Sequence, residues 1–293
     1  MLRAKKPADV ERRLKLFIFG PAKSGKTLFS LNFPKPYLID TERGSECPKY
    51  RKALEDRDGV RYQTSSYDDL IIEVKSLISE KHDYKTLIID PITTIYENVL
   101  NSEMTKKLSP ETAKKTNPNA FGKPFADTNK KMKVLTLLLL RLDMNVILTS
   151  HIKEKFDDRM AKIGETFDCW KKQDYLFDLI LKTQKDYTAV VEGSRFENFE
   201  RGEIIPIDFS LFSEKFEKEY LLRETKPYHF VSTKDLAEIN SLVKSLNVPD
   251  EIVQKWIEKA EVDALSDLGE EEARKILEYL RAKTNESNKI AIN

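Results

Sequence analysis

The sequence has few of the residues that build disulfide-stapled or zinc-bound proteins. Its 293 residues include two cysteines, Cys47 and Cys169, and three histidines, with no Cys-x-x-Cys pair. Two cysteines cannot form a disulfide framework, and neither residue type recurs at the spacing of zinc ligands. We therefore expect a protein of a reduced, cytoplasmic environment.

Long apolar runs are also missing. The longest covers residues 134–140, includes a threonine and stops at Arg141, and the mean hydropathy of the chain is -0.52. A helix that crosses a bilayer needs about 20 predominantly apolar residues. The basic start of the chain leads into further charge, unlike a secretory signal. We expect no membrane association.

A strong net charge is absent as well, since 50 Lys+Arg residues against 49 Asp+Glu residues leave +1. The charges are nevertheless unevenly distributed. Residues 1–36 have nine basic and two acidic residues, residues 101–145 have nine and four, and residues 234–293 have nine and thirteen. The net charge gives no indication of nucleic-acid binding. The N-terminal and central segments are nevertheless basic, and the C-terminal segment is acidic.

Short apolar runs alternate with helical patterns over the first two hundred residues. Near-continuous apolar strands separated by helices indicate a mostly parallel sheet covered on both faces. We therefore expect an α/β domain over residues 1–232. The expected strands are residues 14–19, 37–40, 60–63, 86–90 and 145–149, with two further strands at 179–181 and 188–191.

Two regions differ from this pattern. Residues 102–131 form one long polar, lysine-rich stretch, which predicts a functional or disordered loop. From residue 233 the chain shows three amphipathic helical patterns, at 235–246, 249–260 and 270–282. We expect a small acidic helical module over residues 233–293, which either contacts a partner or packs as a cap.

A phosphate-binding motif follows the first expected strand. Its residues match G-x-x-x-x-G-K-[ST] and precede an apolar run that starts with Leu28. Backbone N–H groups of such a loop surround phosphate oxygens, the lysine reaches the β- and γ-phosphates, and the hydroxyl binds Mg²⁺. The sequence thus predicts a site for ATP and Mg²⁺. The motif consists of Gly20, Pro21, Ala22, Lys23, Ser24, Gly25, Lys26 and Thr27.

Two later strands end in carboxylates at the edge where ligands bind in such sheets. The strand at 86–89 ends in Asp90, which we expect to position the Mg²⁺. Pro91 follows it, so a general base must come from elsewhere. Asp40 and Glu42 end the second strand, and Glu42 can activate the attacking water. The alternative is that both carboxylates only cap the next helix.

The order of these strand ends resembles the RecA-type recombinase core over residues 14–205, and most of all the RecA-like proteins of bacteriophages, which include Sak-type single-strand annealing ATPases. The resemblance implies that Glu42 is the catalytic glutamate and that His151, after Thr149-Ser150, senses the γ-phosphate. It also implies that Tyr50, in Pro48-Lys49-Tyr50, stacks on adenine, although Tyr50 lies one residue further from the glutamate than in RecA. A lone histidine is otherwise more often a surface or core residue.

The same resemblance implies contacts with single-stranded DNA. The loop after His151, residues 152–172, lies where RecA-type proteins bind DNA, and it includes Phe156, Phe167 and Trp170. The lysine-rich stretch corresponds to the first DNA-facing loop of RecA, and clustered lysines suit binding to a phosphate backbone. Its candidate residues are Lys114, Lys115, Lys123, Lys130 and Lys131. The other interpretation is a solvated, flexible loop.

The sequence thus predicts a slow, Mg²⁺-dependent ATPase that acts on single-stranded DNA in phage recombination or strand annealing, in the cytoplasm of a bacterial host. Assembly into rings or filaments is expected, with Arg195 as a finger reaching a neighbour's γ-phosphate. The alternative is an ATP-switched loader or accessory protein that docks a replication or packaging partner. We also expect a single-strand-binding or replication protein as a partner. A nucleotide or small-molecule kinase is less favoured, because Glu42 lies where a hydrolase needs it.

Overall fold

The computed structural model describes residues 13–108, 122–225, 228–260, 262 and 264–291. The chain forms two compact units. The first consists of Met1–Ile72, His82–Asn129 and Asp143–Thr225. The second consists of Glu73–Lys81, Lys130–Leu142 and Lys226–Asn293. Two long helices, α3 (Tyr67–Ser79) and α6 (Lys123–Arg141), contribute to both units.

The first unit is built on an eight-stranded sheet in the order β10-β9-β8-β1-β5-β4-β2-β3. The pairs from β8 to β3 are parallel, and β9 and β10 add antiparallel strands at one edge. The sequence-based expectation of a mostly parallel sheet is confirmed. The strands are β1 (Lys15–Phe19), β2 (Pro36–Asp40), β3 (Val60–Gln63), β4 (Thr86–Asp90), β5 (Asn145–Ser150), β8 (Leu179–Thr183), β9 (Thr188–Ser194) and β10 (Ile204–Pro206).

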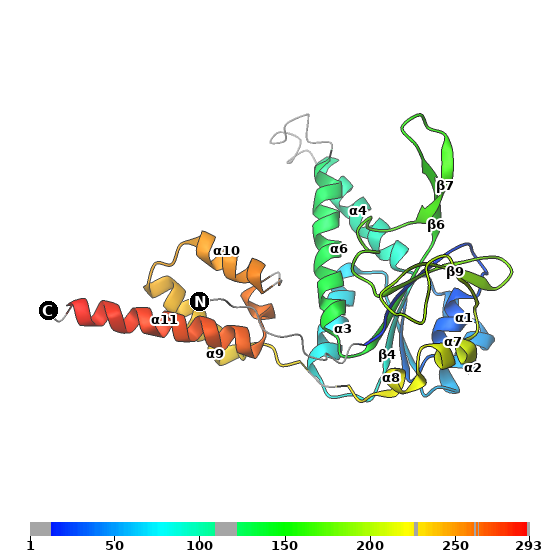
Figure 1. Cartoon of the computed structure of the whole chain (residues 1–293). Coiled ribbons are helices and arrows are strands. Elements are labelled where there is room, and N and C mark those ends of the chain that lie inside the picture. Colours follow the sequence, from blue (N-terminus) through cyan, green and yellow to red (C-terminus); the bar gives the residue numbers. More distant parts are fainter. Residues whose placement is uncertain (1–12, 109–121, 226–227, 261, 263, 292–293) are drawn as a thin grey trace. The chain divides into compact units, whose positions relative to one another are not determined.

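Alternate residues of the buried strands face opposite sides of the sheet. On one side Leu16 and Ile18 of β1 belong to a core cluster with Phe29, Phe209 and Phe212. These aromatic residues come from α1 (Lys26–Leu31) and α7 (Phe209–Lys215), and α2 (Pro48–Glu55) and α8 (Lys218–Leu222) add to the same layer. Helix α4 (Ile92–Leu108) lies on the other side, against β5 (Figure 1).

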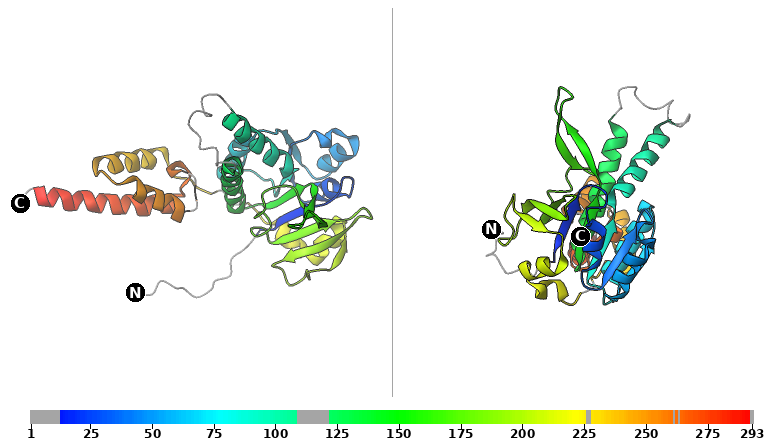
Figure 2. Two further views of the ribbon diagram at one scale, coloured as in Figure 1. Left: turned by 90° about the horizontal axis from the view of Figure 1, so that it is seen from above. Right: turned by 90° about the vertical axis from the view of Figure 1, so that its right-hand side faces the viewer.

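A two-stranded antiparallel hairpin follows β5. Its strands are β6 (Ile152–Phe156) and β7 (Lys162–Phe167). Phe167, at the base of the hairpin, packs edge-on against Phe17 of β1 with ring centroids 5.0 Å apart. Beyond this base the hairpin projects from the sheet, on the side toward which α4 also extends (Figures 1 and 2).

The second unit includes three C-terminal helices. They are α9 (Thr233–Ser245), α10 (Asp250–Lys259) and α11 (Glu270–Ala291), with a short 3-10 turn, η2 (Leu265–Asp267), between the last two. Ser232 caps α9 by accepting a hydrogen bond from the Asp235 amide. Ile239, Leu268, Leu277 and Leu280 are buried in the centre of this cluster. None of the helices in the described residues has the length and apolarity to span a membrane.

The lysine-rich stretch differs from its prediction. The expected loop covered residues 102–131, but α4 continues to Leu108 and α6 begins at Lys123. Lysine is a good helix former, and Pro124 is tolerated in the first turn, where its missing N–H has no helical partner. Only residues 109–121 of the stretch lie outside the described residues.

Candidate functional site

The parallel register brings four strand ends to one edge of the sheet. Asp40 of β2 pairs in register with Asp90 of β4, and Phe19 of β1 pairs with Ser150 of β5. Strand β5 therefore lies between the phosphate-loop strand and the strand that ends in Asp90. The motif glycine, both acidic strand ends and His151 meet at this edge, as the sequence predicts.

The phosphate loop runs from Gly20 to Thr27, between β1 and α1. Gly25 precedes α1 with a φ of 92°, in the left-handed region that disfavours other residues. Gly20 lies against β8, where an added Cβ would be 1.9 Å from the Thr183 hydroxyl. That hydroxyl also hydrogen-bonds Ser24 Oγ at 2.6 Å. Gly25 is thus required by its backbone conformation, and Gly20 by the close approach of Thr183.

Lys26 is folded back over its own loop. Its Nζ donates to the Gly20 carbonyl at 2.9 Å and to the Pro21 carbonyl at 2.8 Å. Burial lowers the pKa of Lys26, while the nearby carboxylates of Asp90 and Glu42 oppose that shift. A phosphate bound in the loop would provide stronger, charge-assisted partners than these neutral carbonyls.

Asp90 has the environment expected of a Mg²⁺-positioning carboxylate. Its side chain accepts hydrogen bonds from Thr149 and from Thr27, the hydroxyl of the phosphate motif. Burial raises the pKa of Asp90, and these two hydrogen bonds and the Lys26 ammonium counteract the rise. Among the described residues no cluster of three or more acidic, histidine or cysteine side chains could hold a metal. One carboxylate and one hydroxyl still suit Mg²⁺, which takes its other ligands from phosphates and water.

Glu42 and Asp40 have different environments, although they end the same strand. Asp40 is buried and accepts hydrogen bonds from the backbone amides of Glu42, Gly44 and Ser45. It therefore holds the loop after β2 together, whereas neither Asp40 nor Glu42 caps the next helix, α2, whose N-cap is Cys47. Glu42 Oε1 instead accepts a hydrogen bond from the Thr94 hydroxyl at 2.6 Å, and Glu42 Oε2 lies 3.5 Å from His151 Nε2. Glu42 is thus a solvent-accessible carboxylate held at the site.

His151 connects the site to the hairpin. It directly precedes β6, and its backbone amide donates to Thr93 Oγ1 at 3.0 Å in the first turn of α4. Thr93 Oγ1 also lies 3.1 Å from Ser150 Oγ. Consecutive threonines of α4 therefore fix both partners, because Thr93 holds the backbone of His151 and Thr94 holds the carboxylate of Glu42.

Tyr50 lies on α2 and is half-buried against the core. Burial raises the pKa of the Tyr50 phenol, and the nearby Asp90 carboxylate adds to that rise. Tyr187, in the turn between β8 and β9, would lie 3.3 Å from a Cβ at Gly25 and is exposed. Tyr187 thus lies against the phosphate loop. Stacking of Tyr50 on adenine stays a prediction.

The predicted DNA-binding lysines are only partly described. Lys123 and Lys130 are seven residues apart on α6, which places them on one side of the helix. Lys131 is half-buried on another side, and Lys114 and Lys115 lie outside the described residues. The aromatic residues of the hairpin region differ from expectation, because Phe167 and Trp170 are buried in the core and only Phe156 is exposed.

Arg195 also has a partner within its own chain. Its guanidinium pairs with Asp178 at 3.0 Å and donates to the Tyr175 carbonyl at 2.8 Å. Half of the side chain is exposed. A finger role in a neighbouring protomer would require it to exchange these contacts, and that role stays a prediction.

Sequence reasoning missed the hydroxyl groups that support the site. Thr93 and Thr94 position His151 and Glu42, Thr149 binds Asp90, and Thr183 holds the phosphate loop. Their placement at strand ends or just after one was the available signal. Threonine is too common at such positions to be singled out from sequence.

A glycine-rich phosphate loop on a parallel sheet, with Lys26, Thr27 and Asp90 converging on it, defines a nucleotide-binding P-loop ATPase. Residues 12–198 match the family model described as an AAA domain, and the chain belongs to that family. A search of curated proteins found no match.

Proposed function

We propose that this ATPase is a RecA-like protein of the phage Sak-type group that hydrolyses Mg²⁺-ATP slowly and acts on single-stranded DNA in recombination or strand annealing, within the cytoplasm of a bacterial host. The observation that carries the proposal is the contact between Glu42 and His151. It joins the candidate water-activating carboxylate to the residue that directly precedes the projecting hairpin.

The chemistry follows from the side chains at the sheet edge. The loop amides and Lys26 would bind the phosphates, and Thr27 and Asp90 would hold Mg²⁺, which neutralises charge on the phosphate oxygens. Glu42 would orient the attacking water and accept its proton. His151 would donate a hydrogen bond toward the γ-phosphate end of the site. An imidazole engaged there can no longer keep its present contact with Glu42.

Two features support a DNA-facing surface. The hairpin projects from the sheet on the same side as the end of α4 (Figures 1 and 2). Exposed apolar side chains near its tip, Phe156, Met160 and Ile163, suit stacking on bases or packing between them. The exposed lysines of α6, Lys123 and Lys130, suit contacts with the phosphate backbone.

The first test is ATP turnover by the full chain with and without oligothymidylate, at low and moderate salt. We expect DNA to stimulate turnover and added salt to reduce that stimulation. Replacing Lys123 and Lys130 by alanine should weaken the effect, whereas Lys218→Ala on α8 is the matched control. Lys26→Ala should abolish ATP binding. If DNA does not change the rate of ATP turnover under any of these conditions, the proposed action on DNA is contradicted. The assignment as an ATPase is not affected by that result.

Oligomeric assembly is part of the same proposal. A site that takes Arg195 from a neighbour is complete only between protomers. Light scattering after size exclusion, with ATP and single-stranded DNA present, should show rings or filaments. A monomer under all of these conditions would contradict assembly.

A second candidate is an ATP-switched loader that docks a replication protein. The charges of the hairpin favour it, because Lys153 pairs with Asp168 at 2.6 Å and Lys162 with Glu154 at 2.7 Å. Four basic and four acidic residues between 152 and 167 leave the hairpin uncharged overall, so its apolar tip suits a protein as well as DNA. Retention of a replication protein by the immobilised chain only with ATP, together with turnover indifferent to DNA, would favour this candidate.

A further inference from the structure

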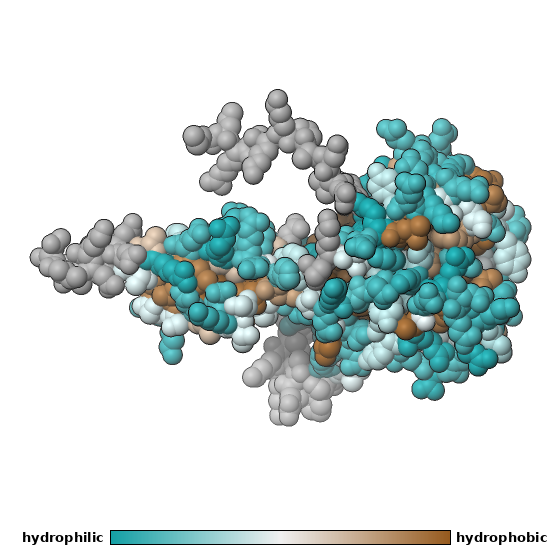
Figure 3. All heavy atoms as spheres, turned by 90° about the horizontal axis from the view of Figure 1, so that it is seen from below, coloured by the Kyte–Doolittle hydropathy of each residue, from teal (hydrophilic) through white to brown (hydrophobic). Residues whose placement is uncertain are grey.

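The apolar face of α10 is incompletely covered. This helix is amphipathic, with Ile252, Val253, Trp256 and Ile257 on its apolar side. None of its residues is fully buried, whereas α9 and α11 bury Ile239, Leu277 and Leu280. A helix of a stable domain normally buries its apolar stripe. In Figure 3 apolar side chains of the C-terminal helices reach the surface as a strip bordered by hydrophilic ones.

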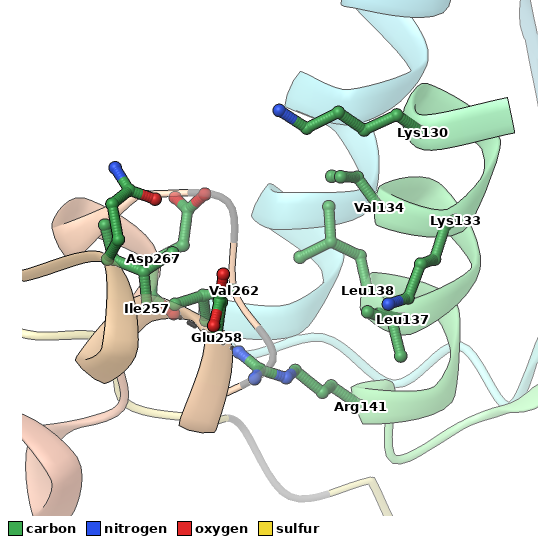
Figure 4. A pocket seen from close by; sticks show the side chains of 11 residues that line it. Lys130, Lys133, Val134, Leu137, Leu138, Arg141, Ile257, Glu258, Val262 and Asp267 are labelled. Atoms are coloured by element: carbon green, nitrogen blue, oxygen red, sulfur yellow. Dashed lines mark hydrogen bonds between the residues drawn. The ribbon is translucent and has the colours of Figure 1, made fainter. Parts of the chain in front are cut away.

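Hollows lie on two sides of α10. One, of about 300 Å³, is lined by Ile257 and Glu258 of α10 and by Leu138 of α6. Figure 4 shows Arg141 extending from α6 across its lower end, and the Arg141 guanidinium donates to the carbonyls of Ala260 and Asp267. This first hollow is therefore closed at one end by a bonded arginine.

The second hollow is larger, at about 460 Å³, and lies between α10 and α11. Trp256 and Tyr279 form its aromatic wall, with ring centroids 6.1 Å apart and ring planes at 78°. Ala260, Leu268 and Ile276 add apolar surface. An apolar concavity with an aromatic wall is the geometry that receives a large side chain of a binding partner.

The rim of this second hollow is basic within an acidic module. Its charged lining residues are Lys259, Lys275 and Glu272. The Glu272 carboxylate accepts a hydrogen bond from the Tyr228 hydroxyl. Lys275 pairs with Glu271 at 2.7 Å, but both side chains are more than 60% exposed, so an incoming carboxylate can replace that partner. Lys283 places its ammonium 5.3 Å from the Tyr279 ring centroid.

We propose that this hollow docks a peptide segment of a partner protein, in which one large apolar side chain is flanked by carboxylates. The apolar side chain would fill the space beside Trp256 and Tyr279, and the carboxylates would meet Lys259 and Lys275. The proposal goes beyond the ATPase site and does not depend on DNA binding by the hairpin.

Two observations favour a peptide over single-stranded nucleic acid at this place. Trp256 and Tyr279 are set edge-to-face in a concave wall, not as parallel platforms open to successive bases. Residues 234–293 have thirteen acidic and nine basic residues, and this excess repels a long phosphate backbone. A short acidic segment contacts only the local basic rim.

The test uses the full chain as bait for a displayed library of random peptides, followed by fluorescence anisotropy with the enriched peptides. We expect enrichment of sequences with an aromatic residue or leucine beside aspartate or glutamate. Their affinity should fall by roughly tenfold for Lys259→Glu combined with Lys275→Glu. Trp256→Ala should cause a similar loss, roughly tenfold, by removing the aromatic wall.

Matched controls separate docking from folding. Lys244→Glu reverses a lysine on α9, away from the lining of the hollow, and should leave affinity unchanged. The rim lysines are exposed, so their reversal should leave the far-ultraviolet circular dichroism of the chain intact. Failure of any peptide to enrich, or peptides that bind the rim variant as well as the wild type, would overturn the proposal. Displacement of the peptides by oligothymidylate would assign the hollow to nucleic acid instead.

Discussion

Replacing Glu42 by glutamine should stop turnover while leaving ATP binding intact. The amide keeps the shape of the side chain, and its oxygen can still accept the Thr94 hydroxyl, now 2.6 Å from Glu42 Oε1. Glutamine cannot take a proton from water, however. Loss of a general base lowers kcat by about 10²–10⁴-fold, equivalent to about 3–5 kcal/mol in activation free energy. The phosphate-binding groups, Lys26 and Thr27, are unchanged.

The assay compares phosphate release at saturating ATP with equilibrium binding of a fluorescent ATP analogue. Glu46→Gln is the matched control, because Glu46 is an exposed carboxylate of the same loop and should behave as the wild type. A Glu42→Gln variant whose turnover stays within about threefold of the wild type would remove the water-activating role. A variant that loses ATP binding would show that Glu42 supports the site structurally instead.

Two further predictions concern the support of the phosphate loop and the stability of the sheet. Thr183→Val removes the hydroxyl that hydrogen-bonds Ser24 at 2.6 Å and should raise KM for ATP by roughly tenfold, with a smaller change in kcat. Thr183→Ser keeps a hydroxyl and should have the KM of the wild type. Equal effects of the two variants on KM would contradict this role. Burial lowers the pKa of Lys15 from 10.5 to about 7, so between these values the unfolded chain binds a proton that the folded chain lacks, and stability rises with pH by about 1.4 kcal/mol per unit. Urea unfolding at several pH values across this window should show that contribution in the wild type and not in Lys15→Met, and parallel curves for the two proteins would refute it.

The sequence predicted the parts of the site that lie within short segments. The phosphate loop is contiguous, Asp90 ends an apolar strand, and Glu42 lies two residues after another one. Parallel strand ends meet at one edge, so the convergence of these residues follows from pattern alone. The different environments of Asp40 and Glu42 did not follow from the sequence pattern, because they depend on which backbone amides of the loop donate hydrogen bonds to Asp40.

Contacts between distant segments were the part that sequence patterns could not supply. Thr94 reaches Glu42 across 52 positions of the chain, and Ser24 meets Thr183 across 159. The burial of Phe167 also depends on tertiary structure, since its ring packs on Phe17 of β1. The prediction of a DNA-binding loop over residues 152–172 did not include the burial of Phe167. Local pattern specifies elements, while the partners of individual side chains depend on how those elements pack.

The position of Phe167 and His151 constrains how a ligand on the hairpin can affect catalysis. Phe167 ends β7 and packs on the phosphate-loop strand β1, so the base of the hairpin is fixed to the rigid part of the sheet. His151 precedes β6 and contacts Glu42 at 3.5 Å. Ile152, the first residue of β6, pairs with Phe167 at this base, so a ligand that shifts the hairpin acts on the segment directly next to His151. Coupling between the hairpin and ATP turnover should thus be lost in His151→Ala, even where basal turnover persists.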